Sequence, residues 1–216
     1  MRKFYFPVLF FLIFAVFFVT AEAQTFYGTT DLKTFREGRD KEFRNKAESP
    51  LKAEDFADFK GLSYFPVNSG YRFNARFKQT PGEKYFQMPT SSGNSTKYKK
   101  FGVLSFELNG RIYSLSAYQW ELPEIDRKYA EYKDFLLVPF KDKTNGSETY
   151  GVGRYVYLKI PESNETILDF NLAFNPSCAY RSGRYSCPIP PKENHLPIKI
   201  NAGEKSYLSA ENNKQK

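Results

Sequence analysis

FGVLSFELNGRIYSLSAY, residues 101–118, is the stretch that decides the fold. Apolar and polar residues alternate on both sides of Asn109-Gly110, which is typical of strands with one buried face. Asn and Gly accept the positive φ angles of a type I′ turn, whose twist matches that of two antiparallel strands. The stretch therefore predicts a β-hairpin. Its expected cross-strand pairs are Phe106 with Tyr113 and Leu104 with Leu115.

Similar patterns predict further strands on both sides of the hairpin. Residues 71–78 alternate between apolar and polar side chains, and Phe135–Phe140 is a continuous apolar run whose two faces we expect to be covered. Residues 91–100 are polar and are expected to form a loop, and residues 121–133 a helical turn at the edge. About seven strands joined by turn residues predict a mainly β fold, an antiparallel barrel or sandwich. The remaining predicted strands are 154–160, 166–174 and 196–201.

One or two helices are expected to pack on this β-domain from its N-terminal side. Residues 31–45 form an amphipathic pattern with Leu32, Phe35, Arg39 and Phe43 on one face, and Asp31 is a suitable N-cap. Ser49-Pro50 resembles the start of a second, short helix. We therefore divide the chain into an N-terminal helical segment (24–48), a single β-rich domain (49–207) and a polar C-terminal tail (208–216).

The first 23 residues resemble a secretory signal peptide. Two basic residues precede an apolar run from Phe4 to Val19, and Ala21-Glu22-Ala23 fits the pattern of a cleavage site. The prediction is a periplasmic or secreted protein without a membrane span after signal removal; the alternative is an uncleaved anchor. The net charge of +8 comes from scattered residues, and no nucleic-acid-binding motif is present, so we expect no nucleic-acid partner.

Four blocks of the chain resemble the family known as domain of unknown function 1684. They are Gly61–Pro66, the Gly102–Gly110 half of the hairpin, Pro139–Tyr155 and Leu168–Lys205. The resemblance implies a shared fold and a bacterial source, and no activity. Longer members have an additional N-terminal region that is absent here. His195 stands where the family leads us to expect a basic residue such as Arg, so no catalytic role is carried over to it.

Cys178 and Cys187 are the two cysteines of the chain. A flexible loop of small and polar residues separates them, and in an oxidising compartment such a pair is expected to form a disulfide. One alternative is a metal site that adds His195 and Glu193, although the spacing matches no known zinc motif. A second alternative is a pair of free or redox-active thiols. We expect no metal and no cofactor.

The best candidate for a ligand site follows the apolar run 135–140. Asp142, Thr144, Thr149, Tyr150 and Arg154 offer a carboxylate, two hydroxyl groups, an aromatic ring and a guanidinium that can grip an anion or a sugar. The alternative is a tight loop in which Asp142 and Thr144 bond their own backbone and Arg154 pairs internally.

Two further polar pairs extend this candidate site. Asp169 and Asn171 fall two residues apart on a predicted strand, so they are expected to share a face, with Arg154 as a partner. Glu193 and Asn194 precede the last predicted strand. The favoured hypothesis is a non-catalytic β-domain that binds an unknown small polar ligand or glycan. One alternative is a hydrolase that pairs carboxylates such as Asp142, Asp169 or Glu193. Another is a structural envelope protein.

Overall fold

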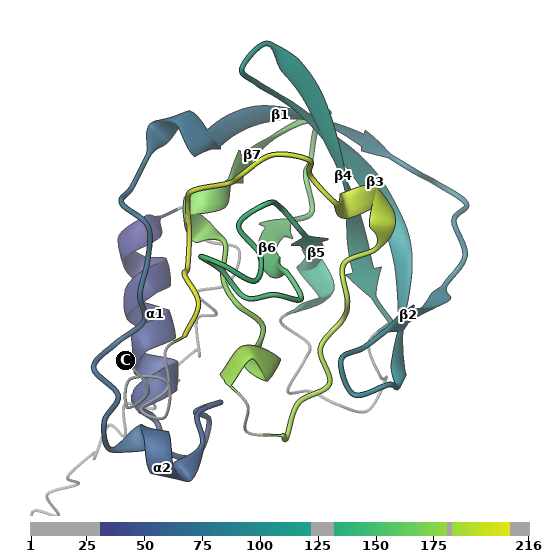
Figure 1. Ribbon diagram of the computed structural model, residues 1–216. Helices are drawn as coiled ribbons and strands as arrows, with labels where there is room; N and C mark the ends of the chain where they lie inside the picture. The colour runs from purple at the N-terminus through teal and green to yellow at the C-terminus, as the bar shows by residue number, and fades with distance from the viewer. Residues whose placement is uncertain (1–30, 122–131, 181–182, 208–216) are drawn as a thin grey trace, which may run out of the picture.

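The computed structural model describes residues 31–121, 132–180 and 183–207. Seven antiparallel strands form one curled sheet in the order β6-β5-β4-β3-β1-β7, with β2 paired to β3 (Figure 1). The predicted mainly β, antiparallel fold of about seven strands is confirmed. The strands are β1 (Arg72–Gln79), β2 (Phe86–Pro89), β3 (Ser95–Leu108), β4 (Arg111–Trp120), β5 (Phe135–Phe140), β6 (Arg154–Lys159) and β7 (Glu165–Asp169).

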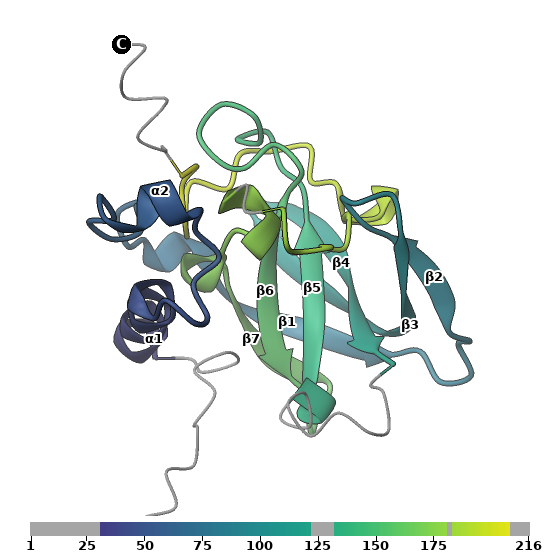
Figure 2. The same ribbon diagram turned by 90° about the horizontal axis from the view of Figure 1, so that it is seen from below.

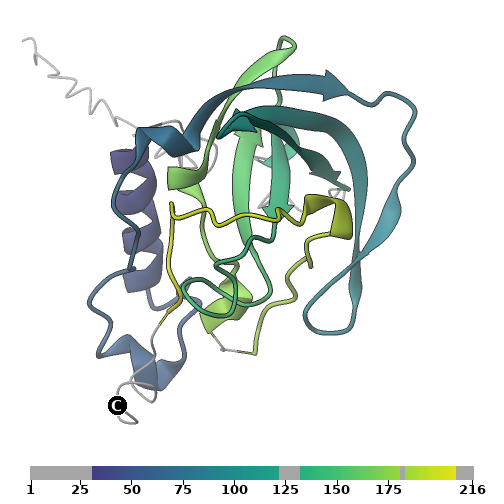
Figure 3. The same cartoon turned by 45° about the horizontal axis from the view of Figure 1, so that its top comes forward.

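The hydrophobic core fills the inside of the curl. Leu104, Leu115, Val138 and Leu158 come from four neighbouring strands and are all buried. The edge of β6 pairs through Tyr155 with the chain that follows β7 at Phe174, so the two ends of the sheet approach each other. The C-terminal segment then runs across the open end of the curl, as Figures 1 and 3 show in yellow.

The hairpin has the predicted register. Phe106 pairs with Tyr113 and Leu104 with Leu115, while Asn109 and Gly110 have φ angles of 53° and 72°. Both angles are positive, as a type I′ turn requires.

Three predicted segments differ from the structure. The expected loop at 91–100 instead contributes the start of β3, because residues 95–98 pair with β2 and residues 98–100 pair with β4. The predicted strand 166–174 ends at Asp169, where the 3₁₀ helix η3 (Phe170–Leu172) begins. Residues 196–201 form no strand, because they make only isolated backbone bonds such as that from the Leu196 N–H to the Lys141 carbonyl. The sheet still has seven strands because β2, which was not predicted, is one of them.

Helix α1 (Leu32–Arg44) lies against one side of the sheet (Figure 2). Asp31 caps it as predicted, accepting a 2.9 Å bond from the Thr34 N–H. Its buried residues Phe35, Arg39 and Phe43 recur every four positions and face the β-domain. Helix α2 (Ala53–Phe56) begins after Lys52, so the start predicted at Ser49-Pro50 is wrong. The Ser49 hydroxyl accepts a hydrogen bond from the Leu51 N–H, ahead of the helix. The other 3₁₀ turns are η1 (Ser69–Tyr71), η4 (Ser177–Tyr180) and η5 (Lys192–Asn194).

The predicted signal peptide and polar tail lie outside the described residues, as does most of the turn predicted at 121–133. No helix in the described part of the chain has the length and hydrophobicity that crossing a membrane requires.

Candidate functional site

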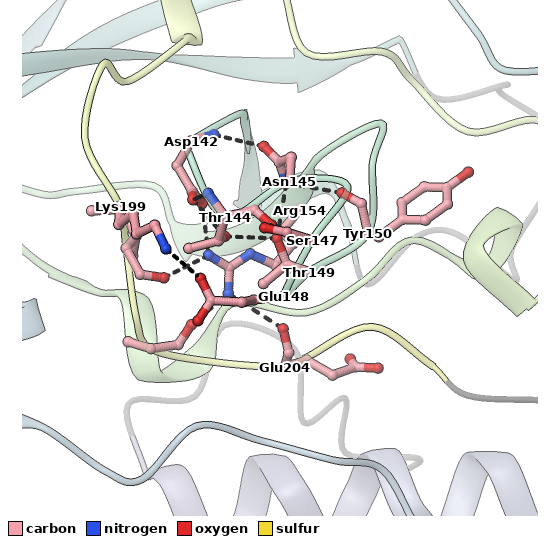
Figure 4. A network of polar contacts seen from close by, with 12 residues as sticks. Asp142, Thr144, Asn145, Ser147, Glu148, Thr149, Tyr150, Arg154, Lys199 and Glu204 are labelled. Atoms are coloured by element: carbon pink, nitrogen blue, oxygen red, sulfur yellow. Dashed lines mark hydrogen bonds and ion pairs between the residues drawn. The ribbon is translucent and has the colours of Figure 1, made fainter. Parts of the chain in front are cut away.

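Arg154 is the centre of a buried polar network (Figure 4). Its Nη2 donates to Asp142 Oδ2 at 2.7 Å and to the Ile200 carbonyl at 2.9 Å. Its Nη1 donates to the carbonyls of Ala202 and Glu204. The side chains of Asp142 and Arg154 have no solvent exposure. Burial lowers the pKa of Arg154, and the Asp142 carboxylate opposes that effect. The guanidinium thus ties β6 to the C-terminal segment.

The loop after β5 is closed by its own side chains. Asp142 Oδ1 accepts from both the backbone N–H and the hydroxyl of Thr144, at 2.6 and 2.5 Å. The hydroxyls of Thr144 and Thr149 are 2.7 Å apart, and Asn145 Nδ2 donates to the Tyr150 carbonyl at 2.8 Å. The structure therefore brings together the side chains of Asp142, Thr144, Thr149 and Arg154. Tyr150 joins them through its backbone carbonyl. The hydrogen-bonding groups that were expected to face a ligand face one another.

Asp169 and Asn171 lie apart from this network. The strand ends because Asp169 caps η3: its Oδ1 accepts from the backbone and side-chain amides of Asn171, both at 2.8 Å. Its Oδ2 lies 3.5 Å from Arg72 Nη1, so Arg72 and not Arg154 is its ionic partner. Asn171 in turn binds both backbone groups of Asn68. The shared strand face expected for this pair is wrong, because a helical turn replaces the strand.

Asn194 completes the sheet where β4 and β5 diverge. The two strands pair only at Tyr118 and Leu137. Beyond that point the Asn194 amide bonds the N–H and the carbonyl of Ser116 in β4, at 2.7 and 2.8 Å, and the Pro139 carbonyl in β5, at 2.7 Å. A side-chain amide carries a donor group and an acceptor, as a peptide bond does. It can therefore replace the backbone hydrogen bonds that would otherwise join the two strands.

Glu193 is the most exposed of the expected site residues. Its Oε1 accepts a 2.7 Å bond from the hydroxyl of Tyr118, which is itself buried. Burial and the Glu193 carboxylate both raise the pKa of Tyr118. Asp142, Asp169 and Glu193, the carboxylates considered for a hydrolase, are thus bonded to three different sets of partners.

The predicted disulfide between Cys178 and Cys187 is confirmed, with an S–S distance of 2.05 Å and a Cα–Cα distance of 6.1 Å. Both thiols are consumed by the bond, so neither the metal site nor the free thiols considered for this pair are present. Within the described residues no three His, Cys, Asp or Glu side chains come close enough to hold a metal ion. His195 Nε2 lies 3.2 Å from the Pro190 carbonyl.

A second buried network was missed from the sequence. Glu204 is buried and accepts from Tyr180, from both amides of Asn175 and, at 3.4 Å, from Arg39 of α1. Burial raises the pKa of Glu204, and Arg39 opposes that effect. Arg39 stands between Phe35 and Phe43 on the buried face of α1, and a charge at such a position is the signal that points to a buried partner.

An open groove was also missed. It lies where the β2–β3 hairpin meets the disulfide loop and has a volume of about 760 Å³. The hydroxyl of Ser186, next to Cys187, joins the two segments through bonds of 2.6 Å to Ser92 and 2.7 Å to Thr90. The stretch TSSGNST at 90–96 was the sequence signal, and it was interpreted as a loop. The lining residues are Pro89, Gly93, Asn94, Ser95, Thr96 and Ser186.

Comparison with known proteins places this architecture in a family. The family model described as "Protein of unknown function (DUF1684)" matches residues 57–205. The chain belongs to the DUF1684 family. All the groups that bond Arg154 and Glu204 lie within the matched residues except Arg39, which α1 supplies.

A solved structure of related sequence agrees with this assignment. It is the solution NMR structure of an uncharacterised protein of Haloarcula marismortui, which is 36% identical in sequence and has a TM-score of 0.64. The match covers 82% of the present chain and 93% of that chain. No curated protein matches the present chain.

Proposed function

We propose that the protein is an exported, non-catalytic β-domain that binds a small polar ligand or glycan, and that the ligand binds in the open groove beside the disulfide. The observation that carries this proposal is the chemistry of the groove: hydroxyl and amide groups line it and no charged side chain does. The Asp142–Arg154 network supports ligand binding less, because its side chains are buried and bonded to protein groups.

The groove suits a ligand rich in hydroxyl groups. Thr96 offers a hydroxyl and Asn94 an amide, each of which can both donate and accept. The hydroxyls of Ser95 and Ser186 already donate to Gln87 and Thr90. The groove is wide open to solvent, so a ligand there would lie across the surface. The neutral lining favours an uncharged ligand, because an ionic ligand would lose hydration without gaining an opposite charge.

The disulfide supports both export and a preformed groove. Disulfides persist in oxidising compartments, in agreement with the predicted signal peptide. Ser186 is adjacent to Cys187 in sequence, and the Ser91 N–H donates 2.9 Å to the Cys187 carbonyl. The disulfide loop thus fixes one wall of the groove against the hairpin.

A ¹⁵N-HSQC titration tests the proposal, with glucose, N-acetylglucosamine, their disaccharides and citrate as probes. The expected result is saturable shifts of the amides of residues 90–96 and 186 with a saccharide and none with citrate. Asn94→Ala should weaken the binding, whereas the control Asn164→Ala, an exposed Asn in a distant turn, should not. Shifts centred on 142–154 would move the site to the buried network. No shifts with any probe would favour a structural envelope protein.

A further inference from the structure

The chain contains two Asn-Gly pairs, and both lie in turns at the surface. Asn109-Gly110 forms the tip of the β3–β4 hairpin, and Asn145-Gly146 lies in the loop after β5. Gly110 and Gly146 are both exposed, and both have positive φ angles. Exposure and the Asn-Gly sequence therefore do not distinguish the two pairs, whereas their hydrogen bonds do.

Asn109 and Gly110 are not restrained by hydrogen bonds of their own. No described residue hydrogen-bonds the Asn109 side chain or the Gly110 N–H. The space around Gly110 is open, and the turn is held only by the flanking pair of Leu108 and Arg111. The Asn109 amide can therefore approach the Gly110 nitrogen without breaking a bond that either group makes.

Asn145 and Gly146 are restrained at both groups. The Asn145 side chain accepts from the Asp142 N–H at 2.6 Å. It donates to Thr149 Oγ1 at 3.0 Å and to the Tyr150 carbonyl at 2.8 Å. The Gly146 N–H donates to the Thr149 carbonyl at 2.9 Å. The Asn145 amide and the Gly146 nitrogen can therefore meet only after several of these bonds have broken together.

We propose that Asn109 is a site of spontaneous deamidation in the folded protein and that the loop after β5 protects Asn145. Asparagine is thermally labile, and a following Gly has no side chain to obstruct its own nitrogen. The Gly110 nitrogen attacks Asn109 Cγ, the new N–Cγ bond replaces the Cγ–Nδ2 bond, and ammonia leaves with the proton of the Gly110 amide. Water then opens the cyclic imide at either carbonyl and gives aspartate or isoaspartate.

The modification changes the turn that sets the hairpin register. Isoaspartate adds a carbon atom to the main chain and replaces a neutral amide by a carboxylate. A two-residue turn joins its strands in one register, and the lengthened turn no longer matches the pairing of Leu108 with Arg111. The pairing of β3 and β4 at this end is therefore weakened in the modified protein.

Peptide mapping of the intact protein tests the proposal. Trypsin cleaves after Lys and Arg, so it releases the two pairs in the separate peptides 101–111 and 144–154, in each of which the Asn is the only side-chain amide. The folded protein is incubated at pH 8 and 37 °C, and mass spectrometry follows the conversion of amide to carboxyl. Deamidation should be at least about tenfold faster in 101–111, because reaction at Asn145 requires two or more hydrogen bonds to break together.

The same incubation in guanidinium chloride separates structure from sequence. The loop loses its hydrogen bonds there, so the two rates should become similar. Equal rates in the folded protein, or a difference that persists in the denatured chain, would overturn the proposal.

Asn109→Asp is the matched control for the lengthened turn, because it supplies the carboxylate without the added main-chain carbon. The incubated protein, separated by ion exchange, should show faster hydrogen exchange of its hairpin amides than Asn109→Asp does. Equal exchange would overturn the effect assigned to isoaspartate.

Discussion

Replacing Arg154 by Met is the most informative perturbation of the fold. The side chain has no solvent exposure and donates to Asp142 and to three backbone carbonyls. Met fills a similar volume without a charge, so Asp142 is left buried without its cation. Breaking one partner of a buried pair costs about 3–5 kcal/mol of unfolding free energy. For a domain of this size that corresponds to a fall in Tm of roughly 6–20 °C.

The assay is urea unfolding at neutral pH, followed by the fluorescence of Trp120, the single tryptophan of the chain. A double-mutant cycle with Asp142→Asn separates the pair from the carbonyl contacts, and the coupling energy should be about 1–3 kcal/mol. Lys199→Met is the matched control: it removes an exposed ion pair with Glu148 and should cost less than about 1 kcal/mol. A cost below about 1 kcal/mol for Arg154→Met, or additive single variants, would refute the structural role of the network.

Three further predictions follow from other sites. Gly203→Ala should lower the free energy of unfolding in urea by at least about 2 kcal/mol more than Gly110→Ala does. Both glycines have positive φ, but only at Gly203 would the added methyl group meet a backbone oxygen, at 2.5 Å. Equal losses would contradict this steric argument. Cys178→Ala with Cys187→Ala should cost about 2–3 kcal/mol and speed amide exchange in the 90–94 turn, measured by hydrogen exchange; unchanged exchange would show that the disulfide does not fix the groove. Because the pKa of Glu204 is raised by burial, its contribution to stability is full below the unfolded pKa of about 4.3 and is lost as the pH rises through the folded pKa. Unfolding measured from pH 4 upward should show that loss in the wild type and not in Glu204→Gln, and parallel curves would contradict it.

Features set by neighbouring residues were predictable from the sequence. The Asn109-Gly110 turn fixes the hairpin register by itself, and Asp31 caps α1 through a residue three positions away. The disulfide followed from the predicted compartment and from the presence of two cysteines. In each case the partners are close in sequence or limited in number, so local physical rules were sufficient.

Features set by distant partners were not predictable. Residues 95–98 are polar, yet they form a strand because β2 pairs with them, and β4 pairs with the same strand from Tyr98 onward. The segment 196–201 has a strand-like pattern, but the neighbouring chain offers it only isolated backbone bonds. Asp169 was expected to meet Arg154 and instead meets Arg72, which lies directly opposite it where β1 pairs with β7. The groove arises only where two segments about 90 residues apart meet.

The two buried arginines have a consequence for how the chain is made. Arg39 lies near the start of the described chain and Arg154 in its second half, yet both find acceptors in the short segment 200–204. During synthesis from the N-terminus, neither guanidinium can make all of its hydrogen bonds until that segment has left the ribosome. A nascent chain that ends before residue 200 contains Asp142 and Glu42, but it lacks the three carbonyl groups that bond Arg154 and the Glu204 carboxylate that bonds Arg39. The domain can reach its final state only after nearly all of it has been translated.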